Sequence, residues 1–187
     1  MAQITQANMQ AADIIVSTGS GTVSAVIRTG SGSPYSHAAL YVGEGKIIEA
    51  IGEGVVRQTL DSALSDDTLA VVYRRKGLTP AQANLVIRYV SAQVGKSYDY
   101  AGVAGASKYT TGGMLMRLVS IPLGVLQDAG ELLNTASPES SFFCSELVLR
   151  AFEQANAPIT FKPATASNPS DIPGSHQVQY VGHLKSS

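Results

Sequence analysis

The stretch "HAALYVGEGKIIEAIGEGVVRQTL", residues 37–60, predicts three short strands in succession. Its apolar runs are separated by "GEG" at 43–45 and again at 52–54, and glycine-rich breaks of this kind are typical of hairpin turns. Further β-rich runs stand before and after it, at 12–19 and at 68–77. The first half of the chain therefore predicts an antiparallel meander.

The pattern changes after the meander to the spacing that is typical of helices. In residues 78–95, Thr79 can serve as N-cap, Pro80 takes the first helical position, and Gly95 stands just past the end. A second helix is expected within 137–158, with Ser140 or Ser141 as its N-cap. The tail closes with one more expected strand, 177–184. This order indicates an α+β domain with an antiparallel sheet packed on helices.

The composition fits one globular domain, residues 1–187. Hydrophobic residues make up 44% and charged residues 14%, which argues against disorder. The net charge of -1 gives no general attraction for nucleic acid, so no nucleic-acid partner is expected. No uncharged apolar stretch of about 20 residues occurs, so we expect no transmembrane segment. The start of the chain does not resemble a signal peptide, and we expect synthesis in the cytoplasm without one.

Cys144 is the only cysteine, which excludes internal disulfides and zinc sites with several thiolates. It lies in the first turn of the helix expected within 137–158. Helix N-termini present unpaired N–H groups and a partial positive charge, which stabilise a thiolate. An ordinary free thiol is mostly protonated at neutral pH, so a nucleophilic cysteine needs such a setting and a base. The alternative, a cysteine packed as a small hydrophobic residue, stays open at this point.

The chain offers three histidines as partners for Cys144. His176 and His183 lie in or beside the turn-rich tail, where we expect a surface or edge role. His37 opens an apolar strand, and an imidazole at the mouth of a sheet can point across a cleft at a helix end. A histidine base also needs an orienting group, and Glu49 on the next expected strand can lie beside His37 in a hairpin. A solvent-facing Glu49 is the alternative.

The ordered set "YSHAALYVG", "KIIEA", "GKSYDY" and "FFCSELV" resembles the circularly permuted branch of the NlpC-type, papain-like cysteine hydrolases. This is the YiiX/YaeF-like group, related to the lecithin:retinol acyltransferase-like proteins, and the resemblance covers most of residues 12–155. It implies a permuted papain-like fold in which the histidine strand precedes the cysteine helix. It further implies Cys144 as nucleophile, His37 as general base and acid, and Glu49 as the group that orients the histidine. Tyr98 matches a family tyrosine whose hydroxyl helps to stabilise the oxyanion.

The apolar stretch at about 101–138 matches no family motif, and we interpret it as an insertion. Core packing is the first expectation for it, with a wall of the substrate groove or a lipid- or protein-binding surface as alternatives. Its role bears directly on which substrate the enzyme takes.

The resemblance implies a thiol hydrolase that cleaves an amide bond without a metal or organic cofactor. We expect its substrate to be a peptidoglycan stem peptide. Because the chain shows no leader of its own, we expect an exported antibacterial effector that acts in a target periplasm, with an immunity protein as partner. Two alternatives stay open: a lipid acyl hydrolase or acyltransferase of the same fold, which would take an acylated substrate, and a binding module without catalysis.

Overall fold

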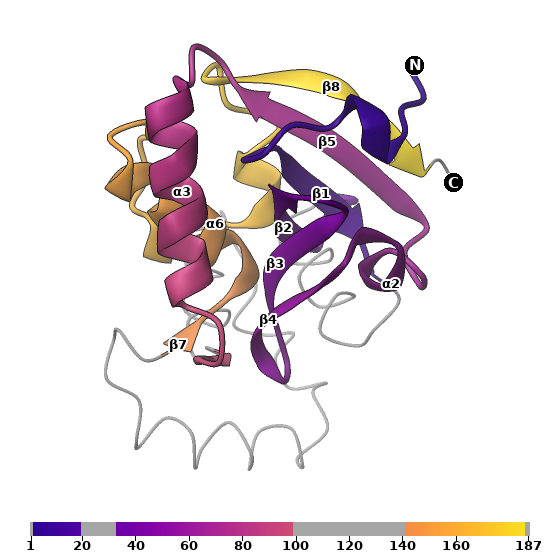
Figure 1. Cartoon of the computed structure of the whole chain (residues 1–187), viewed down its shortest axis with the longest axis horizontal. Coiled ribbons are helices and arrows are strands. Elements are labelled where there is room, and N and C mark those ends of the chain that lie inside the picture. The colour runs from indigo at the N-terminus through magenta and orange to yellow at the C-terminus, as the bar shows by residue number, and fades with distance from the viewer. Residues whose placement is uncertain (1, 20–32, 99–140, 186–187) are drawn as a thin grey trace.

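A computed structural model of the chain describes residues 2–19, 33–98 and 141–185. Six of its strands form one antiparallel sheet in the order β4-β3-β2-β1-β5-β8 (Figure 1). The expected meander is confirmed from β1 to β4, and each "GEG" segment falls at a turn between consecutive strands. The expected strand at 68–77 does not continue it, because β5 pairs with β1 on the other side and not with β4. The strands are β1 (Ile14–Thr18), β2 (His37–Gly43), β3 (Lys46–Ile51), β4 (Gly54–Thr59), β5 (Leu69–Arg75) and β8 (Val178–Lys185).

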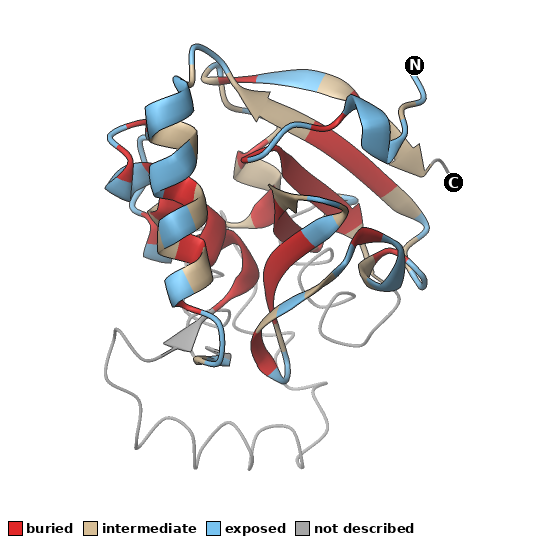
Figure 2. Cartoon of the chain, in the orientation of Figure 1, coloured by how far each residue is buried: buried red, intermediate tan, exposed pale blue. Residues whose placement is uncertain are grey.

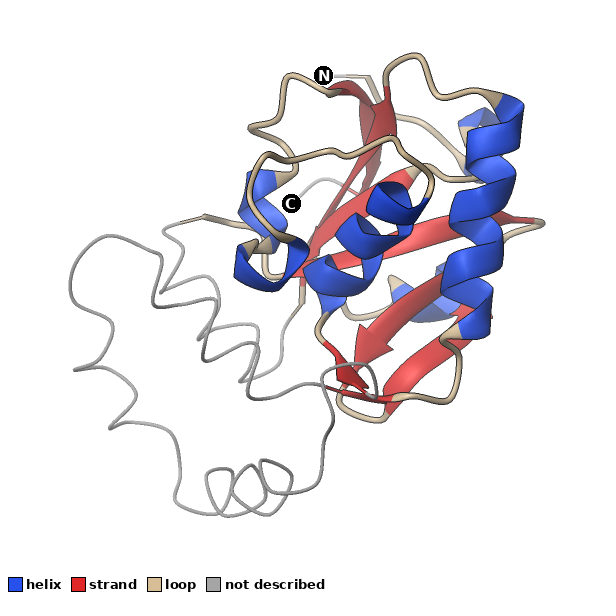
Figure 3. Cartoon of the chain, turned by 90° about the vertical axis from the view of Figure 1, so that its left-hand side faces the viewer, coloured by secondary structure: helices blue, strands red, loops and turns tan. Residues whose placement is uncertain are grey.

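Two longer helices cover one face of this sheet, α3 (Pro80–Ala92) and α6 (Cys144–Gln154), as Figure 3 shows. α3 begins as its sequence predicts, because the Thr79 hydroxyl accepts a hydrogen bond from the Gln82 backbone N–H at 3.2 Å. The remaining short elements are the helix α2 (Leu60–Ala63) and the 3-10 turns η1 (Gln6–Asn8), η5 (Ala164–Ala166) and η6 (Pro169–Asp171).

The two faces of the sheet bury different clusters, because side chains alternate along each strand. One face packs on α3 and α6, and Phe152 of α6 lies fully buried there with Leu40 of β2. The other face is smaller and is closed by Leu60 and Leu64, at the two ends of α2. Figure 2 shows the resulting pattern, with buried residues along the sheet and α6 and an exposed outer side on α3. The predicted α+β architecture is therefore present.

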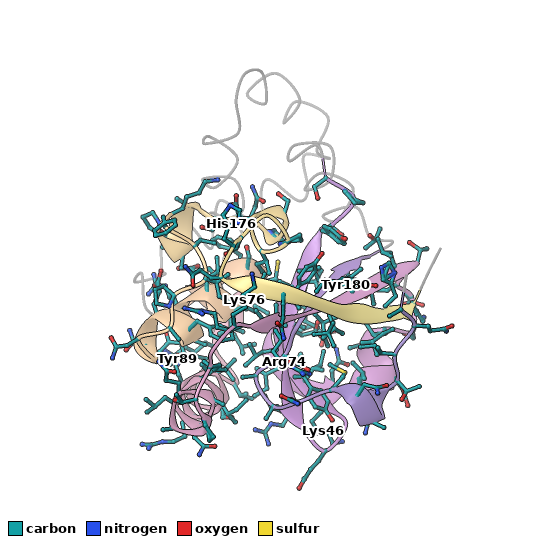
Figure 4. All side chains as sticks on the ribbon, turned by 90° about the horizontal axis from the view of Figure 1, so that it is seen from above. Lys46, Arg74, Lys76, Tyr89, His176 and Tyr180 are labelled. Atoms are coloured by element: carbon teal, nitrogen blue, oxygen red, sulfur yellow. The ribbon has the colours of Figure 1, made fainter. Side chains whose placement is uncertain are left out.

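The N-terminal segment is tied to the sheet by a buried ion pair. Asp13, which precedes β1, is fully buried and accepts two hydrogen bonds from Arg74 of β5, at 2.6 and 2.7 Å. Arg74 lies beside β8 in the view of Figure 4. This bidentate geometry is the strongest that an arginine offers to a carboxylate, and it joins the turn before β1 to the neighbouring strand β5.

A second, two-stranded sheet pairs β6 (Ser97–Tyr98) with β7 (Ser141–Phe142) in parallel. This pairing corrects the expected helix start. Ser141 lies in extended backbone, and the N-cap of α6 is Phe143, which gives no side-chain cap. Ser140 and the expected insertion at 101–138 lie outside the described residues. The single-domain organisation stays a prediction.

Candidate active site

Cys144 is the first residue of α6, as expected for a nucleophile at a helix N-terminus. β7 ends two residues before Cys144, so the β6–β7 pairing fixes the backbone that enters the cysteine helix. The residue is 1% exposed. Backbone N–H groups in the first turn of a helix have no partner within the helix, and such groups can stabilise an oxyanion that forms beside them.

His37 and Glu49 come together through the register of β2 and β3. Glu49 lies opposite Ala39, so His37 is its diagonal neighbour, a separation that long side chains can bridge. His37 Nε2 and Glu49 Oε2 form a hydrogen-bonded ion pair. The Glu49 side chain is 4% exposed and that of His37 20%. The alternative of a solvent-facing Glu49 is therefore wrong.

The His37 ring also contacts the cysteine. Burial by itself lowers the pKa of His37, but a hydrogen bond with Cys144 and then one with Glu49, together with their charges, outweigh it. The result is that the pKa of His37 is raised well above its usual 6.5, which favours the protonated ring. Because Nε2 faces Glu49, Nδ1 is the ring nitrogen left for the sulfur.

Gln58 of β4 is a fourth member of this group that the sequence does not predict. Its side-chain amide donates to Glu49 Oε1. Burial raises the pKa of Glu49, but the hydrogen bond and charge of His37 and the Gln58 amide outweigh this and lower it below its usual 4.5. The signal in the sequence is weak: Gln58 alternates with exposed Arg57 in β4, which places it on the face that carries Glu49.

Tyr98, the expected oxyanion residue, is the last residue of β6. Its backbone pairs with Phe142 of β7, two residues before Cys144. The segment that precedes it is fixed to β4, because the Val55 N–H donates to the Lys96 carbonyl at 2.8 Å. The main chain of Tyr98 is thus held beside the segment that enters the cysteine helix. Its role in catalysis stays a prediction.

The other two histidines occupy the surface and edge positions expected for them. His176 is exposed, and its carbonyl accepts a hydrogen bond from Lys76 Nζ at 2.9 Å (Figure 4). His183 lies on the edge strand β8, with its ring 5.5 Å from that of Tyr180.

Within the described ranges, no group of three or more His, Cys, Asp or Glu side chains is arranged to hold a metal ion. In the same ranges, no helix is both long enough and apolar enough to cross a membrane.

The family model of the permuted papain-like amidases, the YaeF/YiiX or C92 family, matches residues 8–109, which is more than half of the chain. The chain belongs to the C92 family. This C92 chain is also 28% identical over 201 residues to the "Probable lipoprotein peptidase YaeF" of Escherichia coli (strain K12). That alignment covers 98% of the chain and 73% of YaeF. The YaeF/YiiX resemblance of the sequence is confirmed, and the family is one of papain-like amidases and peptidases.

A crystal structure of the metalloprotein YiiX from Escherichia coli O157:H7 (DUF1105) shows the same fold. It superposes with a TM-score of 0.68 at 17% identity, over 94% of the C92 chain and 97% of YiiX. The likeness confirms the permuted papain-like architecture, in which the histidine strand precedes the cysteine helix.

Proposed function

We propose that this C92 enzyme is a cysteine amidase that hydrolyses amide bonds within peptidoglycan stem peptides. The observation that carries the proposal is the place of the His37 imidazole between Cys144, at the start of α6, and Glu49, with which it forms an ion pair. The description of the family as amidases and the name of YaeF, a probable lipoprotein peptidase, support an amide substrate in the cell envelope.

In the acylation step, the Cys144 thiolate attacks the carbonyl carbon and the carbonyl electron pair moves to oxygen. The backbone N–H groups at the start of α6, with the Tyr98 hydroxyl, stabilise this oxyanion. When the tetrahedral intermediate collapses, the C–N bond breaks and His37 Nδ1–H protonates the leaving amine. A thioester on Cys144 and a neutral His37 remain.

In the deacylation step, neutral His37 removes a proton from water and the resulting hydroxide attacks the thioester carbon. The C–S bond breaks, the carboxylic acid product leaves, and the thiolate and imidazolium are restored. Glu49 stabilises the imidazolium in both steps and fixes the ring so that Nδ1 faces the reacting atoms.

The direct test is to incubate the purified enzyme with soluble muropeptides and to follow the products by liquid chromatography and mass spectrometry. We expect cleavage products that together contain one added water, with a rate that falls at least about a thousandfold in Cys144→Ala. The matched control is Arg57→Met, an exposed residue on the opposite face of β4, which should keep wild-type activity. Intact muropeptides, or equal cleavage by Cys144→Ala, would overturn the proposal. Cys144-dependent release of acyl chains from a lipid extract, with muropeptides intact, would assign the lipid alternative instead.

The second part of the proposal is an exported effector role with an immunity protein as partner. The name of YaeF supports work in the envelope. Directed to the periplasm of a test bacterium, the wild-type chain is expected to lyse cells and Cys144→Ala to leave them growing. Equal toxicity of the two chains would rule this role out.

A further inference from the structure

The carboxylate of Glu49 receives one donor from each neighbouring strand. In the register of β2, β3 and β4, His37 and Gln58 occupy opposite diagonals of Glu49. His37 holds Oε2 and Gln58 donates to Oε1, so neither carboxylate oxygen is buried without a partner. Cys144, His37 and Glu49 thus form the inner part of a longer row of hydrogen-bonded side chains.

This row of hydrogen-bonded side chains extends from Gln58 to one more residue, Ser62 in the short helix α2. The Ser62 hydroxyl donates to Gln58 Oε1 at 3.2 Å. Ser62 is itself placed by the first turn of α2, because its backbone N–H donates to the Thr59 hydroxyl at 3.2 Å. The order from the surface inward is therefore Ser62, Gln58, Glu49, His37, with the cysteine at the end.

The direction of each hydrogen bond decides how the Gln58 amide must lie. An ionised carboxylate only accepts, so the NH₂ end of Gln58 has to face Glu49. The reversed amide would set its oxygen against the carboxylate and leave the Ser62 hydroxyl facing an NH₂ group. A hydroxyl can donate or accept, so the carboxylate sets the direction of the amide, and Ser62 holds the amide in place by donating to its oxygen.

We propose that Gln58, held in place by Ser62, is a positioning residue of the hydrolase that acts through Glu49 on His37. It keeps the buried carboxylate ionised and fixed, so that the imidazolium stays aligned with Cys144. This inference rests on the proposed function of Cys144 and His37.

Other charged groups face the same pair, and replacing Gln58 by methionine changes none of them. Cys144 faces His37 from α6. Asp67, in the segment before β5, interacts with Ser17 and with the charges of His37 and Glu49. Lys185 of β8 donates to the Asp67 carbonyl at 3.3 Å. A change in pH behaviour in Gln58→Met would therefore report the lost hydrogen bond.

The test compares Gln58→Met, Ser62→Ala and the control Arg57→Met on the muropeptide that the wild-type enzyme cleaves. In Gln58→Met we expect kcat to fall about ten- to a hundredfold, the cost of a hydrogen bond to a charged group, with KM within about twofold. In a plot of kcat against pH, the rise of activity on the acid side should move to higher pH. The reason is that Glu49 loses a donor that lowers its pKa. Ser62→Ala should move this rise in the same direction by less, and Arg57→Met should leave it in place.

A merely structural role of Gln58 would lower the melting temperature and leave the rise of activity on the acid side unmoved, and this result would overturn the inference. Alkylation of Cys144 by iodoacetamide, measured over the same pH range, separates this failure from that of the proposed function. If alkylation of the wild type does not depend on His37, the proposed function fails. If it does, and Gln58→Met follows the wild-type profile, only the role of Gln58 fails.

Discussion

At the scale of single residues, the central feature is a charged pair that is mostly removed from water. Burying an ion pair is costly unless its remaining hydrogen-bonding positions are also satisfied. Glu49 meets this condition through His37 on one oxygen and Gln58 on the other. The cost of burial is thereby offset.

The first prediction concerns the pH dependence of stability. The pKa of His37 is raised above 6.5, so its contribution to the free energy of unfolding is complete below about pH 6.5 and is lost as pH rises through the raised value. The pKa of Glu49 is lowered below 4.5, so its contribution is complete above about pH 4.5 and is lost as pH falls through the lowered value. Urea unfolding should therefore show the largest contribution of the pair between about pH 4.5 and 6.5.

Two variants serve as controls for this profile. His37→Asn should remove the loss of stability on the alkaline side, and Glu49→Gln the additional loss on the acid side. If the difference in unfolding free energy between wild type and His37→Asn stays constant from pH 4 to 9, the raised pKa of His37 is contradicted.

At the scale of elements, the chain before the cysteine helix is placed by contacts that span the sequence. β4 holds the segment before β6, β6 pairs with β7, and β7 enters α6 (Figure 1). Gly54, the first residue of β4, allows the backbone of β4 to lie close to the Lys96 carbonyl. Its φ is +114°, and a Cβ there would stand 2.5 Å from the Lys96 carbonyl oxygen.

The second prediction compares Gly54→Ala with Gly43→Ala. Both glycines have positive φ, but a Cβ at Gly43 would meet nothing within 4 Å. Gly43→Ala should cost about 1–2 kcal/mol of stability through backbone strain and keep its kcat. Gly54→Ala should cost more and also lower kcat, because the clash displaces the segment that enters β6 and, through β7, the cysteine. Equal kcat in the two variants, measured well below their melting temperatures, would contradict this placement.

The start of α6 shows where local sequence signals mislead. A run of serines before Cys144 predicts a serine N-cap, but Ser141 pairs with Ser97, which lies far away in the sequence. That pairing keeps the backbone extended until Phe143, so the helix begins at the cysteine itself. Local propensity cannot anticipate a partner strand of two residues. By contrast, α3 begins as predicted because its capping groups are all local.

At the scale of the whole molecule, the fold brings a strand from the first half of the chain to a helix more than a hundred residues later. The meander, both helices and the last strand are predictable, because apolar periodicity and turn glycines specify them. The His37–Glu49 pair is predictable from hairpin register. Gln58 and the β6–β7 sheet are not, because a single polar residue in a strand and a two-residue strand carry almost no periodic signal.

The family and the substrate are separate questions for this enzyme. Family membership establishes amidase or peptidase chemistry, whereas the proposed reacting groups, Cys144 and His37, are common to many amide substrates. The muropeptide experiment is therefore independent of the question of whether the cysteine and histidine act as a pair.

The most direct test of that pairing is the rate of Cys144 alkylation by iodoacetamide from pH 4 to 10, in wild type and in His37→Ala. If the two side chains act as a pair, the wild type is alkylated much faster than His37→Ala, and the two pH profiles differ. Alkylation that rises only in the alkaline range typical of an ordinary thiol, identically in both proteins, would contradict it.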